Sequence, residues 1–204
     1  MLPANLYIRA RTSQSMNTPA HLIAGLAAFG KPETPGQSKY VIAGALAPDL
    51  SLYVMTFWSI WVMGIQPQTV FDELYYSDAW QRVFAIDNSF VLWSILLAFA
   101  LWAGRVGATA FACAALLHIA LDFPVHNHDA RMHFWPVSDW VFVSPFSYWD
   151  TAYHAGIVGG LEMSMCLLLG AVLMMRYRQL LQRAGTAILV LAEMAAGGAF
   201  RILF

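Results

Sequence analysis

Long apolar runs separated by short polar segments make up most of the chain from Thr18 onward. A helix that crosses a bilayer needs about 20 predominantly apolar residues. Five runs reach or approach that length, and they cover residues 40–64, 88–104, 106–123, 154–175 and 184–199. A shorter run over residues 18–30 begins with a polar cap and Pro19, which is typical of a helix start. The pattern predicts an all-α, polytopic membrane helical bundle with about five transmembrane helices plus a short N-terminal half-helix.

Residues 1–15 differ from this pattern because they mix polar and apolar positions without a clear period. They lack the apolar core and cleavage site of a signal peptide. Two interpretations stay open: either Met16 is the biological start and residues 1–15 are an N-terminal extension, or they are an ordinary chain terminus. We expect residues 16–204 to form one membrane domain with a loop rich in histidine and aromatic residues at 124–153.

The composition excludes several classes of protein. Hydrophobic residues make up 59% of the chain and charged residues only 11%, against about 25% charged in an average globular protein. That is too little charge to cover the surface of an ordinary soluble enzyme. The net charge of −1 predicts no strong attraction to nucleic acid. Because the chain is so apolar, we expect membrane lipids to surround it. Cys113 and Cys166 lie in apolar runs and do not indicate a disulfide framework.

Basic residues mark one side of the predicted bundle. Cytoplasmic loops carry an excess of lysine and arginine. If all five helices cross, one side receives Lys31, Lys39, Arg105, Arg176, Arg178 and Arg183. The opposite loops carry only Arg82 and Arg131 among several acidic residues, and Arg201 is the one exception. The 124–153 loop is therefore predicted to be non-cytoplasmic.

Histidines gather near the end of the third long run. Four of the six fall within sixteen positions: His118, His126, His128 and His133. His118 and Asp122 are four residues apart and share one helix face. Imidazole and carboxylate suit zinc, iron or manganese, so the pair could bind one divalent ion. A hydrogen bond between them at the helix end is the alternative.

Two further candidate ligands lie in the first two helices. Asp49 follows Pro48 inside an apolar run, where a carboxylate costs about 2.5–3.5 kcal/mol and needs a partner. Pro48 should also kink the helix. His21, in the half-helix, is expected near the same non-cytoplasmic side. His21, Asp49 and the His118/Asp122 pair thus form either a metal site or a buried polar network that orients the helices.

The histidine-rich loop offers weaker candidates. His126 and His128 have the spacing of ligands for a second ion, although the loop could equally leave them in water. Arg131 is the one fixed positive charge of this loop, and a phosphate could bind it bidentately. Asp87 and Asp129 are the candidates for a general base.

Glu162 and Glu193 are carboxylates inside apolar runs. Such residues are typical of a proton or ion path. The alternative is a pair of protonated side chains that hydrogen-bond between helices.

Three short motifs occur in a characteristic order: His21–Gly25, Gly44–Asp49 and the His118/Asp122 pair. In this respect the chain resembles the YdjM-like, LexA-regulated inner-membrane family of metal-dependent hydrolases, which is distantly similar to zinc-dependent phospholipase C. The resemblance implies a helical bundle in a bacterial inner membrane, a His/Asp metal cluster and hydrolysis. Two histidines of a family motif are missing, because this chain has Ala85–Phe90 at that place.

Together these patterns predict a membrane-bound metal-dependent hydrolase. A divalent ion, zinc above all, would lower the pKa of a bound water to about 7 and supply hydroxide. The expected substrate is a phosphoester or a lipid-derived molecule at the non-cytoplasmic face. A non-enzymatic interaction or structural protein and a metal or ion transporter are the alternatives.

Overall fold

The computed structural model describes residues 17–196. The predicted extension, Met16 and Arg201 lie outside the described residues. Within residues 17–196 the regular structure is entirely helical, without a strand. The predicted all-α class is therefore confirmed.

Nine α-helices follow one another along the described chain: α1 (Thr18–Phe29), α2 (Pro35–Leu46), α3 (Leu50–Phe57), α4 (Pro67–Thr69), α5 (Asp78–Asp87), α6 (Phe90–Trp102), α7 (Val106–Asp122), α8 (Ala155–Arg176) and α9 (Leu180–Ala196). Short 3-10 turns lie at Ala47–Asp49 (η2), Phe123–Val125 (η5) and Thr151–Tyr153 (η6), and π-helical turns lie at Trp58–Val62 (η3) and Val70–Leu74 (η4). The longest segment without helix, residues 126–150, is called the long loop below.

Four helical stretches are long and apolar enough to cross a membrane: Gly36–Val62, Asp78–Trp102, Val106–Val125 and Ala155–Arg176. They correspond to four of the five predicted crossings. The fifth, α9, has 17 described residues, which is short of a full span of about 20. The 12-residue α1 is the short apolar helix that the sequence predicts.

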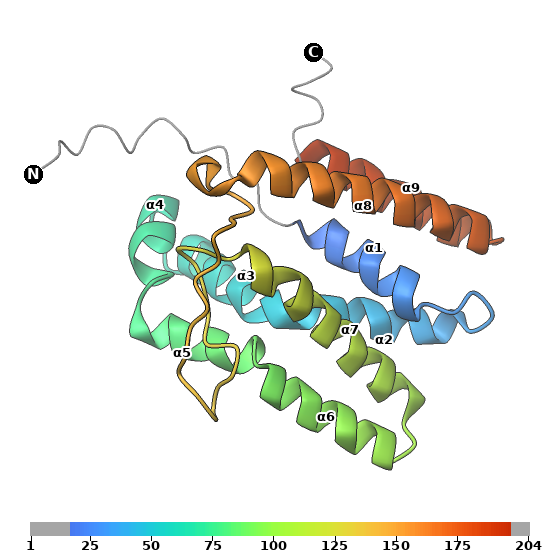
Figure 1. Cartoon of the computed structure of the whole chain (residues 1–204), viewed down its shortest axis with the longest axis horizontal. Helices are drawn as coiled ribbons and strands as arrows, with labels where there is room; N and C mark the ends of the chain where they lie inside the picture. Colours follow the sequence, from blue (N-terminus) through green and yellow to red (C-terminus); the bar gives the residue numbers. More distant parts are fainter. Residues whose placement is uncertain (1–16, 197–204) are drawn as a thin grey trace, which may run out of the picture.

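The helices form layers around α1 (Figure 1). α8 and α9 lie side by side on one face, α1, α2 and α7 form the middle, and α6 covers α7 from the other side. α1 contacts α2, α7, α8 and α9. A residue of α1 can therefore meet side chains from most of the bundle.

Small residues let α2 and α7 approach closely. A Cβ atom added at Gly44 would lie 2.1 Å from the backbone oxygen of Phe111 in α7. Ala45 on α2 and Ala110 and Ala114 on α7 are buried in the same core. Close backbone contact through small residues is a common way to pack helices in membranes. Here it brings the residues just after α2 next to the end of α7.

The helix that begins with α2 breaks at Pro48, as predicted. The Ala47–Asp49 segment is a 3-10 turn between α2 and α3. Proline has no N–H to donate to the preceding turn, so backbone carbonyls there lose partners. Asn88 donates from its side-chain nitrogen to the oxygen of Pro48 at 3.2 Å. The break places Asp49 at the distorted point instead of in a regular helix.

Residues 65–87 contain more helix than the apolar pattern predicts. Ser77 caps α5 by accepting a hydrogen bond from the backbone N–H of Trp80 at 3.4 Å. Trp80 and Phe84 are buried on one face of α5, and both belong to a small core with Val70 and Tyr75. This amphipathic helix lacks a continuous apolar run, which is why hydropathy alone misses it.

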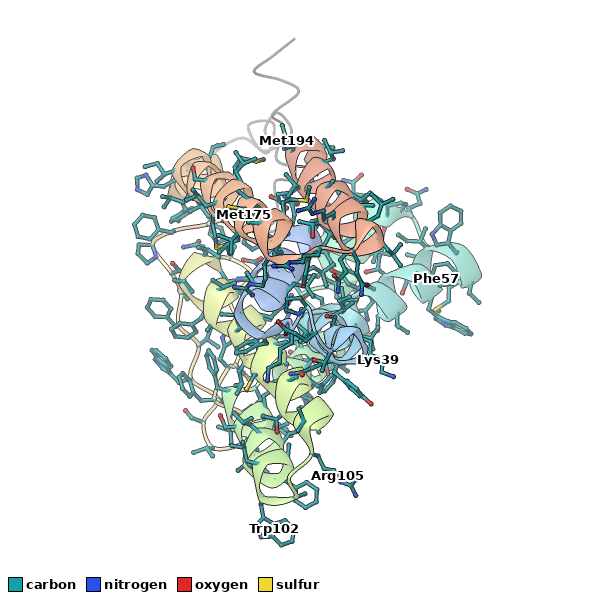
Figure 2. The ribbon with its side chains drawn as sticks, turned by 90° about the vertical axis from the view of Figure 1, so that its right-hand side faces the viewer. Lys39, Phe57, Trp102, Arg105, Met175 and Met194 are labelled. Atoms are coloured by element: carbon teal, nitrogen blue, oxygen red, sulfur yellow. The ribbon has the colours of Figure 1, made fainter. Side chains whose placement is uncertain are left out.

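The loops divide between the two ends of the bundle. The α1–α2, α6–α7 and α8–α9 connections lie at one end, and the long loop runs across the other (Figure 1). Figure 2 views the first end, where Lys39 and Arg105 point outward. The predicted grouping of basic connections at one end agrees with this arrangement. Which end faces the cytoplasm stays a prediction.

Candidate metal centre

The predicted ligands come from three neighbouring parts of the chain. His21 lies in the first turns of α1, Asp49 ends the 3-10 turn after α2, and His118 and Asp122 lie in the last turns of α7. The close α2–α7 packing and the central position of α1 bring them to the end of the bundle that carries the long loop.

His21, His118 and Asp122 form a compact buried group, called the His–Asp group below. One ligand atom from each can be chosen so that all three atoms lie within 4.8 Å of one another. Nε2 of His21 lies 3.0 Å from Asp122 Oδ1, and Nε2 of His118 lies 3.1 Å from Asp122 Oδ2. The two imidazole rings stack with centroids 3.7 Å apart. The group could hold a metal ion.

A backbone carbonyl orients His118. Its Nδ1 lies 2.7 Å from the oxygen of Ala45, which is in the last turn of α2, just before the Pro48 break. A carbonyl can only accept, so Nδ1 carries the proton and Nε2 presents its lone pair toward Asp122. Metal-binding histidines are usually fixed in this way by a hydrogen bond from the other ring nitrogen.

The inner atoms of the His–Asp group have no hydrogen-bond partners in the described chain. These atoms are both ring nitrogens of His21, Nε2 of His118 and Oδ1 of Asp122. Nε2 of His21 and Nε2 of His118 lie close to oxygens of Asp122, but these contacts lack hydrogen-bond geometry. Buried polar groups without partners are costly and rare. A bound cation would satisfy several of them at once.

Asp49 lies at the border of this group. Its Oδ2 is 3.6 Å from Nε2 of His118 and accepts a hydrogen bond from the Tyr53 hydroxyl at 3.3 Å. Its Oδ1 is 3.6 Å from Nη1 of Arg131. Asp49 therefore connects the His–Asp group to the long loop.

Arg131 is buried, although it belongs to a loop. Its guanidinium lies over the ring of Phe84 at 4.9 Å, and Nη2 donates to the Tyr75 hydroxyl at 3.4 Å. Burial acts to lower the pKa of Arg131, but Tyr75 and Asp49 outweigh this effect and raise it. Arg131 is therefore a permanent positive charge beside the His–Asp group.

His126 and Asp129 lie next to the group but face other partners. Nδ1 of His126 is 2.8 Å from the backbone oxygen of Asp122, and Nε2 is 3.7 Å from Oδ2 of Asp129. Tyr148 donates its hydroxyl to the same oxygen at 2.5 Å. Burial raises the pKa of Tyr148 well above its ordinary value, so this phenol stays protonated and keeps donating.

His128 and Asp87 lie outside the His–Asp group. The side chain of His128 is exposed, with Nε2 3.7 Å from Oδ2 of Asp150. Asp87, half-buried at the end of α5, has Arg131 and Asp49 among its electrostatic neighbours. The predicted roles of His128 as a ligand and Asp87 as a base stay predictions.

Two tyrosines of the site have no recognisable signal in the sequence. Tyr75 lies in the 65–87 segment, which the sequence predicts as a loop, and Tyr148 is one of many aromatic residues in the long loop. The long loop brings Arg131 to Tyr75, and its own path brings Tyr148 to Asp129. Only the tertiary structure reveals these hydroxyl groups as part of the site.

Glu162 and Glu193 form a separate cluster with Asn17, called the glutamate cluster below. The backbone N–H of Asn17 donates to Glu162 Oε1 at 2.6 Å, and its side-chain nitrogen donates to Glu193 Oε1 at 3.1 Å. Asn17 immediately precedes α1, whose first N–H groups need acceptors. The carboxylates thus fix the start of the helix that carries His21.

Comparison with known proteins gives no relative for this chain. No family model, no curated protein and no solved structure matches it.

Proposed function

We propose that this protein is a membrane-bound metal-dependent hydrolase. The observation that carries the proposal is the convergence of buried, unpartnered donor atoms from His21, His118 and Asp122. Two imidazoles and a carboxylate are the donor set of many catalytic zinc sites, which leave a fourth position for water. We therefore propose zinc as the ion.

The ion would supply a hydroxide by lowering the pKa of a bound water to about 7. His21, His118 and Asp122 would hold it, and Asp49 is placed to act as a further ligand or to orient His118. The Ala45 carbonyl would keep Nε2 of His118 free for the ion. A general base outside the group completes the chemistry, and Asp129 and Asp87 are the candidates.

Of these two, Asp129 has the more direct connection. His126 contacts both Asp129 and the backbone of Asp122, which holds Asp129 beside the His–Asp group. Asp87 communicates with the site through the charges of Asp49 and Arg131. We favour Asp129 as the base and propose a phosphoester or lipid-derived substrate.

The end of the bundle at which the site lies indicates the side of the membrane that it faces. The His–Asp group belongs to the first turns of α1 and the last turns of α7, which lie at the end of the bundle with the long loop (Figure 1), whereas Lys39 and Arg105 lie at the opposite end (Figure 2). If the positive-inside rule holds, the end with the long loop is non-cytoplasmic. Together with the family resemblance, this supports a site at the outer face of a bacterial inner membrane.

Metal analysis tests the proposal first. The protein is purified in detergent without chelator or metal-affinity tag, and its metals are measured by mass spectrometry. We expect near-stoichiometric zinc, and hydrolysis of p-nitrophenyl phosphate, bis-p-nitrophenyl phosphate or p-nitrophenyl acetate that depends on it. A metal-free protein that also hydrolyses none of them would overturn the proposal.

A further inference from the structure

Arg131 has more hydrogen-bond donors than residues 17–196 satisfy. A guanidinium carries five N–H groups on three nitrogens. In the described chain only Nη2 has a hydrogen-bond partner, the Tyr75 hydroxyl at 3.4 Å, and Nε and Nη1 have none. The side chain is only 4% exposed, so solvent cannot easily compensate. A buried cation with unmet donors indicates an acceptor that the described residues do not provide.

The ion pair with Asp49 does not meet this need. Oδ1 of Asp49 is 3.6 Å from Nη1 of Arg131, which is beyond the 2.7–3.2 Å of an N–H···O hydrogen bond. The other oxygen, Oδ2, faces His118 and Tyr53. Asp49 therefore attracts Arg131 without occupying its donors.

Tyr75 adds another donor at the same place. Its oxygen accepts from Arg131, so its own hydrogen is free for a further acceptor. Burial raises the pKa of Tyr75, which keeps that hydrogen in place. Arg131 and Tyr75 together form a buried set of donors beside Asp49.

The balance of charge around this set favours an anion. A divalent ion in the His–Asp group and Arg131 would bring three positive charges. Asp49 and Asp122 bring two negative charges, and Asp129 is engaged separately by Tyr148 and His126. A charged oxygen ligand between the ion and Arg131 would neutralise the remainder and fill the open donors.

We propose that Arg131 and Tyr75 bind a phosphoryl oxyanion of the substrate, so that the hydrolase acts on phosphoesters. This inference rests on the proposed function. A guanidinium matches the planar, charged oxygens of phosphate and can donate two hydrogen bonds to them. A carboxylic ester or an amide is neutral when it binds and carries an oxyanion only in the transition state, whereas a phosphoester brings its charged oxygens when it binds.

The reaction then balances without a further reactant. A water oxygen forms a bond to phosphorus, and the bond from phosphorus to the ester oxygen breaks. The water proton passes to the general base, which returns it to the leaving alkoxide as this departs as an alcohol. Arg131 and Tyr75 hold non-bridging oxygens whose charge persists through the step.

The test measures phosphate binding and metal content on the same samples. Radiolabelled inorganic phosphate is dialysed to equilibrium against zinc-loaded wild type, Arg131→Gln and Arg131→Lys. We expect Arg131→Gln to keep its zinc and to bind phosphate about tenfold more weakly or worse, because a charge-assisted hydrogen bond is lost. Arg82→Gln is the matched control, since Arg82 is an exposed arginine of α5, and it should bind like wild type.

The lysine variant covers the case in which Arg131→Gln does not fold. Arg131→Lys keeps the charge against Asp49 but loses the planar fork, so it should retain zinc and still bind phosphate more weakly than wild type. Tyr75→Phe should weaken binding by a smaller factor. Wild-type phosphate affinity in zinc-loaded Arg131→Gln or Arg131→Lys would overturn the inference and leave the proposed function standing. A wild type that binds no metal would overturn both.

Competition then separates the two sources of a phosphoryl group. Glycerol 3-phosphate is the soluble competitor, and phosphatidic acid in phosphatidylcholine nanodiscs is the lipid competitor, with diacylglycerol nanodiscs as the phosphate-free control. Displacement of labelled phosphate by either phosphate monoester, but not by diacylglycerol, is the expected result. The stronger competitor identifies a soluble or a lipid substrate, and equal displacement by diacylglycerol would overturn the inference.

Discussion

Two buried polar clusters contact α1, and they differ in how their atoms are satisfied. In the glutamate cluster, the N–H and the side-chain amide of Asn17 donate to Glu162 and Glu193. One oxygen, Oε2 of Glu193, has no hydrogen-bond partner in the described part of the chain. In the His–Asp group, four inner nitrogen and oxygen atoms have none among the same residues. Carboxylates inside the bundle are thus no guide to function by themselves.

The difference has a physical reason. A helix start presents N–H groups, and a carboxylate can satisfy them directly. The two imidazoles and the carboxylate converge here without hydrogen-bond geometry between them, so their inner atoms do not satisfy one another. The first arrangement stabilises the fold on its own, whereas the second gains most from a bound cation.

We expect the largest difference between the two clusters in the zinc content of their variants. His118→Ala removes one donor and the contact with Ala45, so we expect zinc content to fall from near one per chain to background. Glu162→Gln is the control, because it keeps an acceptor for Asn17 and lies outside the His–Asp group. Mass spectrometry of both variants decides, and equal zinc in the two would remove the distinction between the clusters.

The second-largest effect should come from a change at the close contact of α2 and α7. Gly44→Ala would place a methyl group 2.1 Å from the Phe111 oxygen, which forces the two backbones apart. Overpacking of this kind costs about 1–3 kcal/mol or more, and it should also lower zinc affinity because Asp49 moves away from His118. The measurements are the thermal unfolding temperature in detergent and the zinc dissociation constant.

Gly160→Ala is the matched control for that experiment. Nothing lies within 4 Å of an added Cβ at Gly160 in α8. Alanine is favoured over glycine in a helix by about 0.5–1 kcal/mol, so this variant should be as stable as wild type or slightly more so. Equal behaviour of the two variants would mean that the α2–α7 contact does not control the site.

Truncation of Glu162 should act on stability alone. Glu162→Ala leaves the backbone N–H of Asn17 without its acceptor at 2.6 Å, which should cost about 1–3 kcal/mol. Zinc content should stay near wild type, because His21 is displaced little. Thermal unfolding with zinc analysis on the same sample checks both points; a loss of zinc without a loss of stability would contradict them.

The smallest effect concerns pH and the long loop. Burial, together with the positive charges of His126 and Arg131, lowers the pKa of His133 to about 4. The unfolded value is about 6.5, so the unfolded chain takes up the proton first as the pH falls. As the pH falls below 6.5, His133 therefore lowers the free energy of unfolding relative to neutral pH. This decrease is complete near pH 4.

At pH 5.5 this single group should cost about 1 kcal/mol relative to pH 7. Thermal unfolding of wild type and His133→Gln at both pH values isolates the contribution, since other groups titrate in both proteins. The variant should show the smaller decrease on acidification. Parallel pH profiles would show that His133 titrates alike in the folded and unfolded chain.

Local patterns in the sequence were sufficient for much of the fold. The apolar runs predicted four stretches long enough to cross a membrane, and Pro48 predicted the break before Asp49. The short α1 and the shared face of His118 and Asp122 followed from helix periodicity. These features depend on neighbouring residues, so the chain encodes them directly.

Other features exist only through contacts distant in sequence. Arg131 meets Asp49 and Tyr75 because a loop without regular structure packs over the end of the bundle, and no period in the sequence encodes that path. The glutamates meet Asn17 across 145 and 176 residues. The sequence by itself determined the membrane helices and supplied the ligand types. Tertiary packing decided which polar atoms are satisfied by the chain and which remain open for a ligand, because burial and partners depend on every element that surrounds them.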